Sequence, residues 1–143
     1  MYGKVDDDCG KYSVMEITRR FSFEYNGMRN HEVYFDSLSG DSTELATSSA
    51  LYKAIEAQWG SYDAWLARFK AIALTRGIGW AMLYSDRKDG RLLSTWVDEQ
   101  HLGQLQDCVL VLGLDMWEHA YVYDYSTSEK KKYIEAFFEN LNW

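Results

Sequence analysis

Hydrophobic and polar positions along this chain change their spacing, and each spacing predicts a different kind of secondary structure. From Val14 to Leu38 apolar residues recur at steps of three and four, which is the spacing of one face of an α-helix. His31 follows Met28 by three residues and precedes Phe35 by four, so it shares their face. We therefore predict one long amphipathic helix that carries a histidine. Its apolar positions are Val14, Ile17, Phe21, Tyr25, Met28 and Phe35.

Two shorter helices are predicted next. Asp41 or Ser42 can cap a helix that runs from about Glu44 to Gln58. Ser61 is placed to cap a third helix, from Tyr62 to Arg76, whose apolar residues form one stripe. We expect that stripe to face the core.

The spacing then becomes that of β-strands. Trp80–Ser85 and Arg91–Glu99 are predicted to form two strands, joined by a hairpin turn at residues 86–90 that ends in Asp-Gly. The unbroken apolar run Val109–Leu114 predicts a third, fully buried strand. A final amphipathic helix is expected over Glu129–Asn140.

Helices followed by strands and then by helices are typical of the α+β class. We expect an N-terminal helical part, then a helix, a three-stranded antiparallel sheet and C-terminal helices. A length of 143 residues allows one domain or two small ones. The predicted division is a polar tail at residues 1–13, a helical part at 14–59 and an α/β part at 60–143.

Composition narrows the possible partners and setting. The formal net charge of −7 argues against a nucleic-acid surface. No apolar stretch is long enough to span a bilayer and we identify no signal peptide, so no membrane partner is expected. The two cysteines, Cys9 and Cys108, form no disulfide framework. These features predict a cytoplasmic protein.

Candidate chemistry begins where the third predicted strand ends. Asp115 follows the buried run, and His119 comes four residues later. The two side chains can converge if the chain turns after the strand. An oxygen and a nitrogen ligand together suit borderline divalent and trivalent metals. The alternative is that Asp115 caps a helix and His119 merely follows it.

Four short blocks carry a more specific pattern. They are Asn30-His31, Gly77-Ile78-Gly79-Trp80-Ala81, Asp115-Met116-Trp117-Glu118-His119-Ala120-Tyr121 and Asn140-Leu141-Asn142-Trp143. In content and order they resemble the Asn-His, Gly-Ser-Gly-Trp-Ala, Asp-x-Trp-Glu-His-Ala-Tyr and Val-Asn-Trp segments of the iron/manganese superoxide dismutases. The resemblance extends from about Phe21 to the last residue.

The resemblance implies a mononuclear Fe or Mn centre, with one ion per subunit, and a helical N-terminal part beside an α/β C-terminal part. It assigns His31, Asp115 and His119 as metal ligands. It also implies a fourth ligand, a histidine on a preceding helix. The sequence contains 3 histidines, and none precedes His31. We therefore expect the first helix of the family, with its ligand and its tyrosine, to be missing.

Other residues acquire roles through the same resemblance. Trp80 and Trp117 correspond to aromatic walls of the family's pocket, although core packing alone would also explain them. Glu118 corresponds to a carboxylate that bridges to the ligand histidine of a partner subunit, which implies a homodimer.

Gly27 occupies the position of a glutamine in the iron-type enzymes, as in the manganese type. A Gln or His from the loop after the second strand then bonds the metal-bound solvent, and both Gln100 and His101 lie there. Neighbouring residues of an extended segment point opposite ways, so one of the two faces the metal. The sequence does not decide which.

The expected function is that of a superoxide dismutase, which converts superoxide into O₂ and hydrogen peroxide while its metal alternates between the +3 and +2 states. Activity is expected to be weakened by the loss of one histidine ligand. The alternative is a catalytically inactive module that keeps the dismutase fold and binds a partner protein. The metal can be Fe or Mn, and Gly27 favours Mn or mixed use.

Overall fold

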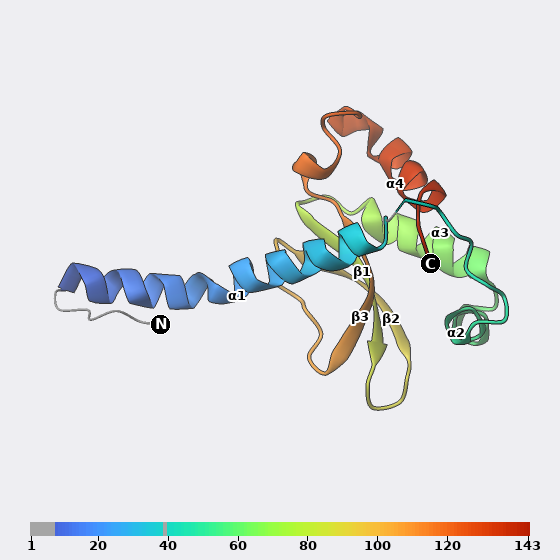
Figure 1. Ribbon diagram of the computed structural model, residues 1–143, viewed down its shortest axis with the longest axis horizontal. Helices are drawn as coiled ribbons and strands as arrows, with labels where there is room; N and C mark the ends of the chain where they lie inside the picture. Colours follow the sequence, from blue (N-terminus) through green and yellow to red (C-terminus); the bar gives the residue numbers. More distant parts are fainter. Residues whose placement is uncertain (1–7, 39) are drawn as a thin grey trace.

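The computed structural model describes residues 8–38 and 40–143. It has the expected α+β architecture, with an N-terminal helix, helices that precede a three-stranded sheet, and C-terminal helices (Figure 1). The elements in chain order are α1 (Asp8–Asp36), α2 (Ala50–Trp59), α3 (Tyr62–Ala73), β1 (Gly79–Asp86), β2 (Leu92–Asp98), β3 (Cys108–Asp115), the 3₁₀ turns η1 (Glu118–Ala120) and η2 (Thr127–Glu129), and α4 (Lys130–Glu139).

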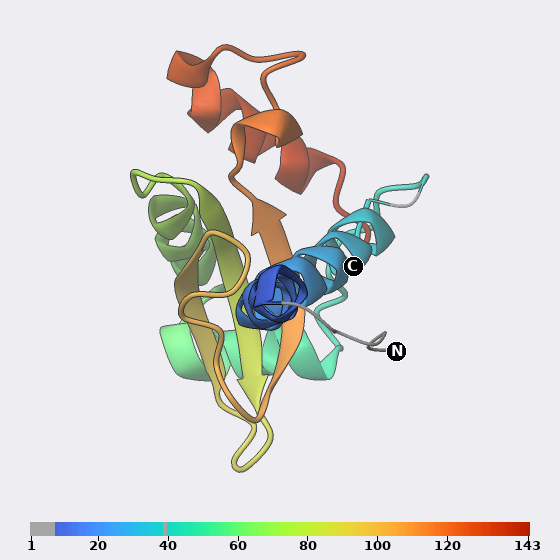
Figure 2. The same cartoon turned by 90° about the vertical axis from the view of Figure 1, so that its left-hand side faces the viewer.

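The sheet has the order β2-β1-β3, and both pairings are antiparallel. Side chains alternate between faces along a strand, so Trp80 of β1 and its partner Asp115 of β3 lie on one face. The Trp80 ring packs against α1 on that face. Leu83 and its partner Ser94 lie on the other, where the indole N–H of Trp65 in α3 donates to Ser94. Helices therefore cover both faces of the sheet (Figure 2).

The hydrophobic core lies between α3 and the sheet and continues to α4. Trp65, Phe69 and Leu83 are fully buried there. The rings of Phe69 and Phe138 meet edge to face at 5.9 Å, which joins α3 to α4. Burial of large aromatic side chains is the main favourable contribution to stability in a chain of this size. Aromatic residues make up 16% of the sequence, and most of them lie in this core or pack against it.

Helix α1 begins earlier than the sequence predicted. It starts at Asp8, not at Val14, so residues 8–13 of the predicted polar tail are helical. Residues 1–7 of that predicted tail lie outside the described part of the chain. The N-terminal half of α1 extends away from the sheet (Figure 1). The predicted division between residues 14–59 and 60–143 stays a prediction.

The face of α1 that packs on the sheet is not its apolar stripe. Gly27, Asn30 and Tyr34 are buried, whereas Phe21 and Phe35 are 58% and 65% exposed. The buried positions recur at helical spacing, but glycine and asparagine gave them no hydrophobic signal. His31 lies at the edge of the buried face, with 31% of its side chain exposed.

Helix α2 starts later than predicted, at Ala50 and not at Glu44. Its N-cap is Ser49, whose hydroxyl accepts a hydrogen bond from the N–H of Tyr52 at 3.1 Å. The residues before it make a long-range contact instead. Thr43 forms an isolated parallel bridge with Asn142, and its hydroxyl donates to the Asn142 side chain at 2.7 Å.

The remaining elements lie close to their predicted positions. Ser61 caps α3 as expected, although the helix ends at Ala73, three residues before Arg76. The strands differ from prediction by one residue at each end. In the described part of the chain, no helix combines the length and apolar character needed to cross a membrane.

Candidate metal centre

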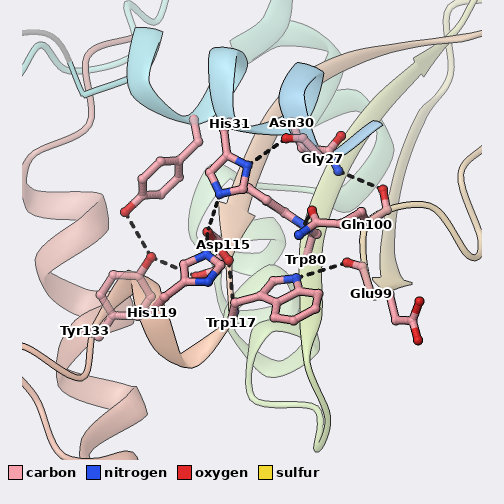
Figure 3. A network of polar contacts seen from close by, with 11 residues as sticks. Gly27, Asn30, His31, Trp80, Glu99, Gln100, Asp115, Trp117, His119 and Tyr133 are labelled. Atoms are coloured by element: carbon pink, nitrogen blue, oxygen red, sulfur yellow. Dashed lines mark hydrogen bonds and ion pairs between the residues drawn. The ribbon is translucent and has the colours of Figure 1, made fainter. Parts of the chain in front are cut away.

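Three side chains from separate elements converge beside the sheet (Figure 3). His31 comes from α1, Asp115 from the end of β3 and His119 from η1. One ligand atom of each lies within 4.8 Å of the others. The Nε2 atoms of His31 and His119 lie 3.4 Å and 3.0 Å from Oδ2 of Asp115.

Asp115 is held by one hydrogen bond to its side chain and one to its main chain. Its Oδ1 accepts from the main-chain N–H of Trp117 at 2.9 Å, and its main-chain carbonyl accepts from the hydroxyl of Tyr133 at 2.8 Å. The chain then turns into η1, which brings His119 back over the carboxylate. The same Asx-type turn that a capping residue makes thus also gathers the two candidate ligands.

His31 is oriented by its own helix. Its Nδ1 lies 2.7 Å from the carbonyl oxygen of Gly27, one turn earlier. A carbonyl oxygen can only accept, so Nδ1 carries the proton. In the neutral imidazole, Nε2 then holds a lone pair directed at Asp115. This arrangement is typical of metal-binding histidines, whose second nitrogen donates to a carbonyl or carboxylate.

The donor set fits a small metal cation. Two ligands bound at roughly 2 Å to one ion, at an angle of about 90–110°, lie about 3.0–3.4 Å apart. The His31–Asp115 and His119–Asp115 separations of 3.4 Å and 3.0 Å match that spacing. A lone pair of His31 and a carboxylate oxygen repel one another unless a proton or a cation lies between them. Two nitrogens and one oxygen suit iron and manganese.

Burial shapes the charge of the site. Asp115 is 1% exposed, and this burial raises the pKa of its carboxyl group above the ordinary value. The N–H of Trp117 and the imidazoles of His119 and His31 act in the opposite direction on that pKa. A bound cation would favour the ionised carboxylate still more, because it would supply the missing positive charge.

Gln100 lies beside this cluster, in the loop after β2. Its Oε1 accepts from the indole N–H of Trp80 at 2.9 Å, and the Trp80 ring meets the His31 ring at 5.0 Å. The Gln100 side chain occupies the space in front of Gly27, where a Cβ would come within 3.2 Å of its Cγ and Cδ. The absence of a side chain at Gly27 therefore leaves room for Gln100.

His101 points elsewhere. Its ring meets Phe23 of α1 edge to face at 5.7 Å, and its Nδ1 has no hydrogen-bond partner among residues 8–38 and 40–143. It does not belong to the cluster of three candidate ligands. Of the two residues that the sequence left undecided, the structure thus places Gln100 toward Trp80 and His31, and His101 toward the outer part of α1.

The two tryptophans and Glu118 frame the cluster. Trp80 is fully buried, whereas the half-buried Trp117 stacks on His119 at 5.7 Å and donates its indole N–H to the carbonyl of Glu99 at 3.1 Å. Glu118 is exposed at the start of η1. Both tryptophans hold neighbouring groups in addition to packing.

Sequence reasoning did not identify Tyr34 and Tyr133. Their hydroxyls lie 3.1 Å apart, and that of Tyr133 donates to the main chain of Asp115. Both occur in segments that were assigned only by helical spacing. A tyrosine at a buried helical position needs a partner for its hydroxyl, which is the signal that could have suggested a polar contact.

Comparison with known proteins identifies the family of the chain. Residues 47–143 match the family model of the C-terminal domain of iron/manganese superoxide dismutases. The chain belongs to this family. The match covers Asp115 and His119, and the family's C-terminal domain accounts for the sheet and α4.

Relatives extend the match through α1. A superoxide dismutase [Fe] from Cupriavidus metallidurans is 43% identical over 134 residues, which cover 92% of this chain and 66% of the relative. One from Aquifex aeolicus is 35% identical over 98% of the chain and 63% of the relative. A superoxide dismutase [Mn] from Halobacterium salinarum is 37% identical over 79% and 55%. The chain thus spans less than two thirds of the length of these relatives.

Proposed function

We propose that this chain holds one Fe or Mn ion through His31, Asp115 and His119 and serves superoxide dismutation. The convergence of two imidazole nitrogens on Oδ2 of Asp115, at 3.4 Å and 3.0 Å, is the observation that carries this proposal. The relatives named as Fe and Mn dismutases support it. Their names do not favour one metal, and Gly27 favours Mn or mixed use.

A metal bound here would take an electron from one superoxide and give an electron to a second, which with two protons yields O₂ and hydrogen peroxide. The residues of the chain prepare the site. The Oε1 atom of Gln100 accepts a hydrogen bond from Trp80. The amide nitrogen of Gln100 is therefore the atom that can donate a hydrogen bond to solvent in the site. The rings of Trp80 and Trp117 exclude bulk water from the buried side of the cluster.

The roles of His31 and Asp115 follow from their hydrogen bonds. The carbonyl of Gly27 keeps the proton of His31 on Nδ1, so that Nε2 remains a donor of electron pairs. The N–H of Trp117 keeps one carboxylate oxygen of Asp115 occupied, which leaves the other oxygen for the cation. Neither side chain has to reorganise on metal binding.

Replacing His119 by Ala tests the ligand assignment. We expect about one Fe or Mn per chain in the unchanged protein and a loss of at least tenfold in affinity in His119→Ala, because a ligand is removed. His101→Ala is the matched control, since it also removes an imidazole but lies outside the cluster. Elemental analysis after dialysis gives the metal content. Full metal in His119→Ala would show that the assignment is wrong.

We further propose that the chain forms a homodimer and acts as an antioxidant protein in the cytoplasm. Glu118 and His119 are exposed beside the site, with 54% of the His119 side chain accessible, and a partner subunit could cover them. The free thiol of Cys108 suits a reducing compartment. Sedimentation equilibrium of Glu118→Ala against the unchanged chain tests the dimer. A monomer in both would contradict it.

The alternative function is an inactive module with the dismutase fold. The observation that favours it is the exposed apolar side of α1, where Phe21, Tyr25, Met28 and Phe35 lie. Large exposed apolar patches mark interaction sites. The rate of superoxide removal per bound metal ion distinguishes the two functions. A rate no higher than that of the free metal ion would support the inactive module.

A further inference from the structure

A polar network of the buried residues Asn30, Tyr84 and Gln100 and the half-buried Gln104 joins α1, β1 and the loop that carries Gln100. Gln104 lies at its centre. The Nε2 atom of Gln104 donates to Oδ1 of Asn30 at 3.1 Å and to the main-chain carbonyl of Gln100 at 3.4 Å. The Nδ2 atom of Asn30 donates to the same carbonyl at 3.0 Å. On the other side, the hydroxyl of Tyr84 donates to Oε1 of Gln104.

The main-chain carbonyl of Gln100 fixes the direction of both amides. It can only accept, and two amide groups face it, so each must present its nitrogen. Turning Gln104 over would place its oxygen against this carbonyl. Turning Asn30 over would do the same. The network therefore has one favourable arrangement, in which the oxygen of Gln104 is left for Tyr84.

The Tyr84 hydroxyl also lies 2.7 Å from Sδ of Met82, but a thioether is a weak acceptor, so the oxygen of Gln104 is its better partner. Tyr84 is 2% exposed, and burial raises the pKa of its hydroxyl far above the ordinary range. The hydroxyl therefore stays protonated at neutral pH and in mildly alkaline solution. Asn30 and Gln100 are 2% and 6% exposed. Loss of a hydrogen bond at such buried sites is not easily made good by water.

The backbone just before Gln100 needs to be held. Glu99 has a φ of 51°, in the left-handed region that residues with a side chain rarely adopt. Its N–H donates to the carbonyl of Ile78 at 3.1 Å, and its carbonyl accepts from Trp117. These bonds hold the residue before Gln100. Asn30 and Gln104 hold Gln100 itself, so the turn is fixed on both sides.

We propose that Gln104 is a positioning residue for the metal site. It ties the carbonyl of Gln100 to Asn30, the neighbour of His31 in α1, and thereby sets where the Gln100 amide lies relative to His31. Gln104 touches none of the three candidate ligands and acts only through Asn30 and Gln100. Its effect on a bound metal rests on the proposed function, whereas its effect on Gln100 does not.

The test compares Gln104→Met, which keeps the length of the side chain and removes its hydrogen bonds, with Gln106→Met. Gln106 is exposed in the same loop. The readout is the indole N–H of Trp80, which donates to Gln100, observed by ¹⁵N NMR in the full chain without added metal. Its signal is identified by its absence in Trp80→Phe. The indole N–H of Trp65, bonded to Ser94 on the other face of the sheet, is the internal reference.

We expect the Trp80 signal to shift in Gln104→Met and its hydrogen exchange to become about fivefold faster, the factor that one ordinary hydrogen bond supplies. The Trp65 signal should change little, and Gln106→Met should leave both signals in place. An unchanged Trp80 signal in Gln104→Met would overturn the proposal. So would equal acceleration of Trp80 and Trp65, because that result indicates general loosening of the fold.

A second measurement keeps the proposal separate from the proposed function. In the Mn-loaded protein, Gln104→Met should retain the metal and shift the Mn(III)/Mn(II) potential. Gln106→Met should retain the metal and leave the potential unchanged. A shift of the Trp80 signal in a chain that binds neither Mn nor Fe would leave the positioning role intact and refute the proposed function. If the chain binds the metal but the Trp80 signal does not move in Gln104→Met, the positioning role is refuted and the proposed function stands.

Discussion

Adding one methyl group at Gly27 tests the packing beside the candidate ligands. A Cβ at this position would lie 3.2 Å from Cγ and Cδ of Gln100 and 3.4 Å from its Oε1. These distances are shorter than ordinary van der Waals contact, so the Gln100 side chain has to move. Its main chain cannot follow, because Asn30 and Gln104 hold the carbonyl. Relieving the clash therefore displaces the side chain by a few tenths of an ångström, at the expense of its hydrogen bond to Trp80.

Two opposing contributions determine the result. Replacing Gly by Ala inside a helix stabilises it by about 1 kcal/mol. Breaking the 2.9 Å bond between Trp80 and Gln100 leaves two buried polar groups without partners, which costs about 1–3 kcal/mol. The cost exceeds the gain. We expect Gly27→Ala to lower the free energy of unfolding by about 1 kcal/mol and the Tm by about 3 °C.

The assay is thermal unfolding followed by circular dichroism, in the unchanged chain and in a Gln100→Ala background. Without the Gln100 side chain the clash disappears, so the same methyl group should then stabilise by about 1 kcal/mol. The sign of the effect thus reverses between the two backgrounds. If Gly27→Ala stabilised both to the same extent, Gln100 would not occupy the space in front of Gly27, and the reasoning would fail.

Three further changes probe other contacts. Tyr133→Phe removes the donor to the carbonyl of Asp115 and should lower the free energy of unfolding by about 1–2 kcal/mol, measured by urea titration; an unchanged midpoint would contradict this. Ser49→Ala removes the N-cap of α2 and should cost about 1 kcal/mol in the same titration. The pKa of Glu129 is held at about 2, chiefly by Lys132, so its contribution is present above the unfolded pKa and is lost as the pH falls toward about 2. Urea midpoints should therefore fall less between about pH 6 and about pH 3 in Glu129→Gln than in the unchanged chain; equal losses would refute the pKa argument.

The sequence was most informative where local spacing and burial coincide. The run Val109–Leu114 predicted a buried strand, and β3 occupies it with one more residue at each end. Asp115 follows directly, and the spacing of four residues to His119 allowed the two side chains to converge if the chain turned there. The convergence of these two side chains is confirmed, and their role as ligands stays a prediction.

Contacts between distant segments could not be read from spacing. The buried face of α1 consists of Gly27, Asn30 and Tyr34, and these residues do not form a hydrophobic pattern in the sequence. Asn30 is buried because the loop after β2 supplies its partners. The same loop decides between Gln100 and His101. Alternation along an extended segment predicted that the two residues point in opposite directions. Which of them faces the candidate ligands depends on how this loop packs against α1.

The predicted start of α2, at about Glu44, was wrong for a similar reason. Asp41 and Ser42 are good capping residues by type, and nothing local distinguishes them from Ser49. What distinguishes them is the contact of Thr43 with Asn142, which holds the preceding segment extended. A helix that began at Glu44 would have to break this contact.

The contact between Thr43 and Asn142 also bears on the order in which parts of the fold form and on the order in which they break under force. It closes a loop of 99 residues, for which the chain entropy alone costs roughly 4 kcal/mol in an unfolded chain. The hydrogen bonds between Thr43 and residues 141–143 use three donor hydrogens. At about 1 kcal/mol for each donor, they cannot meet this cost until the sheet and helices have brought the two segments together. The contact between Thr43 and Asn142 therefore forms late in folding. Under mechanical tension between the two segments it should part first, before any strand separates from its neighbour.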